Sequence, residues 1–167
     1  MTTGTGTAAA PGVEDDAAPH LVVGVDGSPA AAEAARWASQ LAARLGARVV
    51  AIAVAVPQPL VAPGVDIGVA ATTLDLPAVE EGVRARCRQW LDEAVAGLPG
   101  EVVGRVERRV EVGDPTTALL DAAREATMLV LGNHRHGGVA GALLGSVAQQ
   151  CTHRARCPLV LVPGPTT

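Results

Sequence analysis

The chain has 167 residues, 49% of them hydrophobic, and a formal net charge of −4, values that fit one globular domain with a sizeable core. All thirteen basic residues are arginines, which excludes phosphate-loop and Schiff-base lysines. The acidic balance, together with the absence of Phe and Tyr, predicts no nucleic-acid partner and no anionic-membrane partner.

The two ends of the chain differ in composition from the middle. Residues 1–19 are small, polar and rich in Pro and Gly, and we expect a disordered tail there without the pattern of a signal or transit peptide. The domain is expected to span residues 20–163, and residues 164–167 form a second tail. An odd set of three cysteines without a secretion signal predicts reduced thiols and a cytoplasmic location.

The first half of the domain starts with two apolar runs, over 21–25 and 48–56, each typical of a strand buried on both faces. Ser28 as N-cap and Pro29 at the first helical position predict a helix between them, which Gly46 ends. Its predicted buried stripe comprises Ala34, Trp37, Ala38, Leu41 and Leu45.

The middle of the chain carries a weaker signal. Residues 57–73 are rich in Pro, Gly and Ala without a period, and we interpret them as a mobile loop. A helix is predicted over 75–98, with Trp90 on its apolar stripe as a core residue. The run 102–112 alternates and carries charges, which favours a strand at the edge of the sheet.

Gly113-Asp114-Pro115 repeats the pattern of a turn, an N-cap and a proline at the first helical position, and it predicts the start of another helix. Helices and strands continue to alternate after it. The remaining predicted elements are a helix to about 126, a strand over 128–131, a Gly-rich loop over 132–144, a helix capped by Ser146 and running to about 154, and a strand over 158–162. The fold class is therefore α/β, a five-stranded parallel sheet with helices on both faces in the order β-α-β-α-β-α-β-α-β. In such sheets ligands bind at the carboxyl ends of strands where the winding reverses, and Asp26 and Gly132 follow two of these ends.

The most informative segment runs from Gly132 to Ser146. It contains five glycines between a buried strand and a helix start, where free backbone N–H groups and the helix dipole favour an anion. His134 and Arg135 add donors and charge, and the Ser146 hydroxyl can reach a phosphate or a metal on it. A plain Gly-rich surface loop is the alternative, and the strand-before, helix-after context favours the anion site.

Four segments in order resemble universal stress proteins: Val23-Gly24-Val25-Asp26-Gly27-Ser28, Gly113-Asp114-Pro115, the loop ending in Gly145-Ser146, and Ala155 to Val162. The resemblance covers about residues 21–163. It implies a Rossmann-like, adenine nucleotide alpha hydrolase-like fold, a homodimer through the last strand, and ATP as ligand, with or without Mg²⁺. It also implies contacts of Asp26 and Val54 with the adenosine end, and of Gly132, Gly145, Ser146 and Val147 with the phosphates. The full set of candidate nucleotide-binding residues is Asp26, Gly27, Val54, Gly132, Asn133, His134, Arg135, Gly145, Ser146 and Val147.

The chain departs from the family motif at one position, where Arg135 stands in place of the second glycine. An arginine Cβ there can block the approach of a ligand or strain a positive φ. Its guanidinium can equally replace the lost contacts to phosphate. A third alternative is that Gly137 and Gly138 take over the turn one register later.

Three functions follow in order of preference. The first is a nucleotide-binding stress-response or signalling module with little or no catalysis, because the motif offers no general base or nucleophile pair. The second is a dimeric interaction protein of the same fold that no longer binds ATP, and the third is an adenine-nucleotide enzyme of related fold. No catalytic residue and no metal site are predicted, since Cys151 and His153 diverge on their helix.

Overall fold

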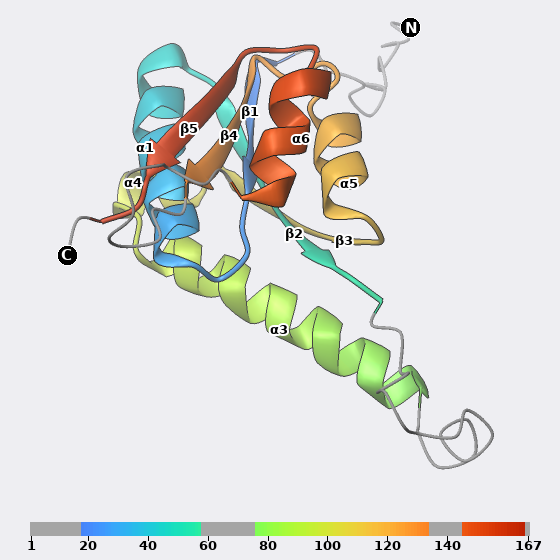
Figure 1. The fold of residues 1–167 in the computed structure, drawn as a ribbon. Helices are drawn as coiled ribbons and strands as arrows, with labels where there is room; N and C mark the ends of the chain where they lie inside the picture. Colours follow the sequence, from blue (N-terminus) through green and yellow to red (C-terminus); the bar gives the residue numbers. More distant parts are fainter. Residues whose placement is uncertain (1–17, 58–75, 134–144, 166–167) are drawn as a thin grey trace, which may run out of the picture.

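The apolar runs form five parallel strands in the order β3-β2-β1-β4-β5, as the computed structural model shows (Figure 1). The structure describes residues 18–57, 76–133 and 145–165. The predicted loop at 57–73 and tail at 1–19 lie mostly outside these ranges, and His134 and Arg135 lie entirely outside them. The strands are β1 (His20–Gly24), β2 (Arg48–Ala55), β3 (Val106–Val112), β4 (Met128–Asn133) and β5 (Leu159–Pro163). The predicted α/β class and strand alternation are confirmed.

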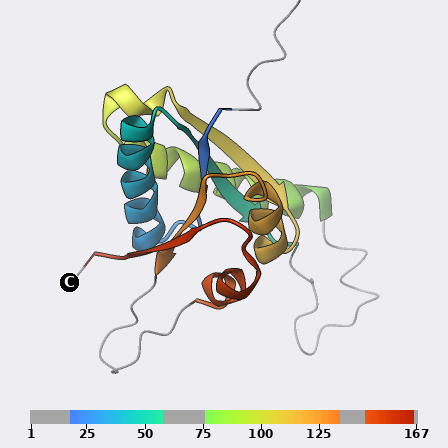
Figure 2. The same cartoon turned by 90° about the horizontal axis from the view of Figure 1, so that it is seen from above.

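Helices cover both faces of the sheet. One face carries α1 (Pro29–Leu45) and α3 (Leu76–Ala96), and the other carries α5 (Pro115–Ala122) and α6 (Ser146–Arg154), so that α1 and the α5–α6 pair lie on opposite sides in Figure 2. Side chains alternate accordingly along β1, where Leu21 and Val23 face α1 while Val22 faces α5 and α6. The winding direction therefore reverses between β1 and β4, which is where a ligand site is expected.

The edge strand β3 starts later than the sequence pattern suggests. The prediction of a strand over 102–112 is wrong for its first residues, because the short helix α4 (Gly100–Val103) occupies them. Glu107 on β3 pairs with Arg48 on β2 at 3.0 Å and with Arg109 at 2.5 Å. β3 is the outermost strand of the sheet, so the predicted edge position is confirmed. Charged side chains on an edge strand disfavour its pairing with other chains.

The helix starts follow the predicted caps in two cases out of three. The Ser28 hydroxyl accepts the N–H of Ala31 at 3.1 Å at the start of α1, which ends at Gly46 with φ of 65°. At α5 the Asp114 carboxylate accepts the N–H of Thr117 at 2.8 Å. The prediction that Ser146 caps α6 is wrong: Gly145 is the N-cap, and in the part of the chain that the structure describes no side chain caps the first turn.

Two predicted core residues of α1 are instead exposed. Trp37 is 37% exposed and Leu45 50% exposed, because Leu45 is the last residue of the helix and Trp37 lies at the margin of its buried stripe. The buried face of α1 is almost entirely alanine, comprising Ala30, Ala31, Ala34, Ala35, Ala38 and Ala42, with Ser39. Such small side chains let the helix pack close to the sheet.

All three cysteines are free thiols in the structure. Cys87 and Cys151 are buried and Cys157 is half-buried, and burial raises the pKa of all three thiols. They are therefore protonated and poorly nucleophilic at neutral pH.

Within the described ranges, the helices lack the combined length and apolar character needed to cross a bilayer.

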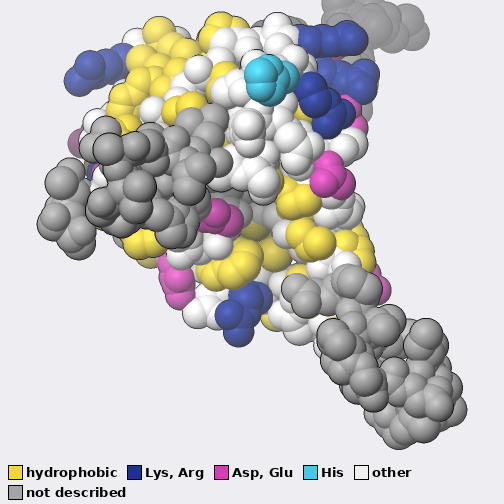
Figure 3. Space-filling model, viewed as in Figure 1, with side chains coloured by type: hydrophobic (Ala, Val, Ile, Leu, Met, Phe, Trp, Pro, Cys, Tyr) yellow, Lys and Arg dark blue, Asp and Glu magenta, His cyan; other side chains and the backbone are white. Residues whose placement is uncertain are grey.

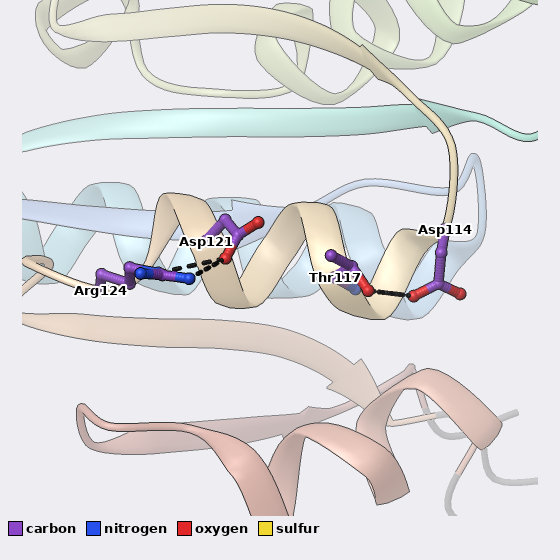
Figure 4. A network of polar contacts seen from close by, with 4 residues as sticks. All are labelled: Asp114, Thr117, Asp121 and Arg124. Carbon is purple, nitrogen blue, oxygen red and sulfur yellow. Dashed lines mark hydrogen bonds and ion pairs between the residues drawn. The ribbon is translucent and has the colours of Figure 1, made fainter.

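The Asp114 cap makes a testable contribution to stability (Figure 4). The N–H and hydroxyl of Thr117 both bond to its carboxylate, at 2.8 Å each, and hold its pKa below the ordinary value. A carboxyl with a lowered folded-state pKa stabilises the fold above its ordinary pKa, and this contribution is lost as pH falls through the folded value. We expect Asp114→Ala to lower the Tm at pH 7, with a difference from wild type that shrinks below about pH 4. A Tm difference that stayed constant from pH 7 to pH 2 would show that the charge contributes nothing.

Candidate functional site

A cavity of about 410 Å³ opens at the carboxyl ends of β1, β2 and β4, at the reversal of the winding. This volume is within the usual range for small-ligand sites. Seven helices and strands and the turn after β1 contribute to it. Its lining residues are Gly24, Val25, Asp26, Ser28, Ala31, Ile52, Val54, Val56, Trp90, Pro115, Leu119, Leu131, Gly132, Gly145, Ser146, Val147 and Ala148.

The turn after β1 supplies the polar group on one wall. The Asp26 carboxylate is exposed and accepts the backbone N–H of Ser28 at 3.0 Å, an arrangement that closes a tight turn. Gly27 sits at φ of 79°, a backbone conformation that glycine adopts without strain. Among the described lining residues, Asp26 is the only one with a charged side chain.

The β2 side of the cavity is apolar. Val54 and Val56 from β2 and the segment after it line it, and Val56 is 43% exposed. Trp90 of α3 adds an aromatic side chain to the lining; it packs on the α1 face of the sheet, whereas Val54 packs on the α5 face. The sequence reading placed Trp90 in the core; it does pack partly against the core, but it also lines the cavity. The helical period could not reveal that Trp90 lines the cavity. It identifies the buried face of a helix, but it does not tell whether a residue on that face covers the sheet or the cavity beyond the strand ends.

The opposite wall is the start of α6, where Gly145, Ser146, Val147 and Ala148 all line the cavity. The first N–H groups of a helix have no partner within the helix. In α1 and α5 the N-cap side chain satisfies one of these groups, whereas among the described residues no side chain does so in α6. This end of α6 therefore presents backbone donors and the positive end of the helix dipole to the cavity.

Gly132 has a packing role that the sequence did not reveal. A Cβ at this position would lie 2.5 Å from the carbonyl carbon of Ala30 and 2.7 Å from the nitrogen of Ala31. The end of β4 thus touches the backbone of the first turn of α1, and only glycine fits. Gly132 also lines the cavity. The same residue therefore allows the close packing of β4 against α1 and forms part of the cavity wall.

The structure brings six of the ten predicted site residues together around the cavity: Asp26, Val54, Gly132, Gly145, Ser146 and Val147. Gly27 adjoins it in the β1 turn. Asn133 is outside the lining, and its buried side-chain oxygen has no hydrogen-bond partner in the part of the chain that the structure describes. His134 and Arg135 lie outside the described residues. Most of the lining residues that were not predicted, such as Ala31 and Leu119, are small or apolar and carry no chemical signal.

Comparison with known proteins identifies the family. The model of the Universal stress protein family matches residues 18–163, which include every strand and every cavity-lining residue. The chain belongs to the universal stress protein family. A universal stress protein of Mycolicibacterium smegmatis is 33% identical over 154 residues, which make up 89% of this chain and 48% of that protein. The chain thus spans about half the length of the curated relatives it matches.

Solved universal stress proteins share the fold along nearly their whole length. One from Burkholderia pseudomallei is 28% identical, with a TM-score of 0.62, and the match covers 90% of this chain and 99% of that one. A universal stress protein solved in complex with cAMP is 27% identical, with a TM-score of 0.54, and covers 90% of this chain and 100% of that one. The family likeness therefore extends to a nucleotide-bound member.

Proposed function

We propose that this universal stress protein binds an adenine nucleotide in the cavity between β1 and β4. The observation that carries the proposal is the start of α6, which has no side-chain cap among the described residues and lines a cavity at the winding reversal of the sheet. Free N–H groups at a helix start form an anion site without any lysine, and this chain has none. The cAMP complex of a relative supports the same class of ligand.

The two walls suggest how the ligand lies. The phosphates lie against Gly145, Ser146 and Val147, where the backbone N–H groups at the helix start and the Ser146 hydroxyl can donate hydrogen bonds to an anion. The base lies toward Val54 on the apolar β2 side, and the Asp26 carboxylate accepts hydrogen bonds from the nucleoside. The intervening surface is formed by β1 and β4, so that the ligand crosses the two central strands.

ATP is the proposed nucleotide, and Mg²⁺ would enter with its phosphates. Among the described residues no group of three or more His, Cys, Asp or Glu side chains is placed to hold a metal. The Ser146 hydroxyl is the protein group suited to contact a phosphate-bound ion. A metal therefore depends on the nucleotide for most of its ligands.

The proposed role is a stress-response or signalling module with little or no turnover. Phosphoryl transfer needs groups that position the nucleophile and stabilise charge, and the described lining offers the single carboxylate of Asp26.

We also propose a homodimer through β5. This edge strand has half-buried apolar residues from Leu159 to Val162, and hydrophobic side chains gather over α1 and β5 in Figure 3.

The test is a calorimetric titration of nucleotide-stripped protein with ATP and Mg²⁺, repeated with Arg135→Gly. We expect micromolar binding by the wild type, and the variant then measures whether Arg135 adds affinity or removes it. Sedimentation velocity on the same samples measures the oligomeric state with and without nucleotide. An assay of phosphate release over hours measures turnover.

The outcomes separate the three candidate functions. Binding without phosphate release supports the nucleotide-binding module. A dimer that binds nothing as wild type and gains affinity with Arg135→Gly identifies an interaction protein whose site is closed by one substitution. Rapid, saturable product formation identifies an enzyme and overturns the proposed role.

A further inference from the structure

The cavity contains an aromatic side chain that the family motif does not include. Trp90 of α3 is half-buried and lines the cavity together with Asp26 of the β1 turn. The chain has two aromatic side chains of the Phe, Tyr and Trp type, and the other, Trp37, is absent from the cavity lining. The location of Trp90 therefore needs an explanation beyond core packing.

The indole is held against the β1 turn. A Cβ built on Gly27 would lie 2.3 Å from Nε1, 2.5 Å from Cδ1 and 2.6 Å from Cε2 of Trp90. Such similar distances to three ring atoms place Gly27 over the face of the five-membered ring rather than at its edge. The glycine thus packs on the indole without a side chain between them, and this contact fixes the ring beside Asp26.

The cavity combines an aromatic ring with exposed apolar surface. Val56 also lines the cavity and is 43% exposed, so the apolar surface of the cavity is not fully covered by the protein itself. Aromatic rings stack on nucleobases with substantial affinity. The backbone donors of α6 lie at the other end, beyond β1 and β4, and suit the phosphate rather than the base.

We propose that Trp90 is a base-contacting residue of this site, with its indole packing against the purine of the bound nucleotide. The proposal rests on the proposed nucleotide-binding function and adds to it a residue that contacts the base. Trp90 also links the ligand to α3, because one side chain contacts both the β1 turn and the cavity.

The experiment compares Trp90→Leu and Trp90→Phe with the control Trp37→Phe, using ATP as the probe. We expect Trp90→Leu to weaken ATP binding about tenfold or more, Trp90→Phe to weaken it less, and Trp37→Phe to leave it unchanged. The Tm of each variant shows whether it is folded. In Trp37→Phe, where Trp90 is the remaining tryptophan, ATP is expected to quench the fluorescence.

Each other result overturns the inference. Equal ATP affinity of Trp90→Leu and wild type would remove Trp90 from the site while leaving the proposed function intact. Equal losses in both Trp90 variants, with no ATP-dependent change of fluorescence in Trp37→Phe, would mean that Trp90 only positions the β1 turn. Wild-type protein that binds no ATP would overturn the proposed function and this inference together.

Discussion

Replacing Gly145 by aspartate is expected to abolish nucleotide binding while the fold is retained. Gly145 is the N-cap of α6, with φ of −56° and ψ of 150°, and aspartate is among the preferred N-cap residues. Its carboxylate would accept the free N–H groups of the first turn and place a negative charge where the phosphate binds. Charges about 4 Å apart near a protein surface repel by about 4 kcal/mol, so we expect at least a 100-fold loss of ATP affinity by calorimetry.

The matched control for this charge is Gly145→Asn. Asparagine caps a helix about as well as aspartate and has nearly the same shape, but it is neutral. We expect a smaller loss of ATP affinity for this variant and a Tm at or above that of the wild type for both. Unchanged affinity in Gly145→Asp would show that the start of α6 is not the phosphate site.

The second large effect concerns the fold itself, because Gly132→Ala is expected to destabilise the protein with or without ligand. The new Cβ would lie 2.5 to 2.7 Å from backbone atoms of Ala30 and Ala31. A backbone cannot move aside as a flexible side chain can, so α1 must shift away from β4. Overpacking of this kind costs about 3 kcal/mol of unfolding free energy, measured by urea denaturation.

A matched glycine in the same chain provides the control. Gly82 is exposed within α3, and a Cβ there would meet nothing within 4 Å. Gly82→Ala is therefore expected to raise the free energy of unfolding by up to about 1 kcal/mol, since alanine favours a helix. If Gly132→Ala were as stable as wild type, the contact between β4 and α1 would not constrain the fold.

Much of the fold is encoded in local patterns that act over a few residues. The apolar run at 21–25 has to be buried on both faces, and Ser28, Pro29 and Gly46 fix the two ends of α1 through their own backbone and side-chain chemistry. The early start assigned to β3 is instructive, because α4 is a single turn. A turn that short leaves no helical period, and its valines resemble the start of a strand.

Site residues could be predicted where they directly follow the end of a strand or precede the start of a helix. They could not be predicted where tertiary packing brings a residue to the cavity. Asp26 and Gly145 follow from the strand-turn-helix pattern, and both line the cavity. Trp90 and Leu119 reach the cavity only because α3 and α5 cross the strand ends at particular positions, which no local pattern specifies. The close approach of Gly132 to Ala30 likewise depends on how near α1 lies to the sheet.

The alanine face of α1 makes the cavity sensitive to residues that do not line it. Ala38 is fully buried, lies two turns from Ala31, and does not line the cavity. A larger side chain there would lift the helix from the sheet, and its first turn, which touches Gly132 and contributes Ala31 to the cavity wall, would move with it. Sequence drift in this distant stretch of helix can therefore reshape the ligand site among related proteins while every residue of the binding motif stays the same.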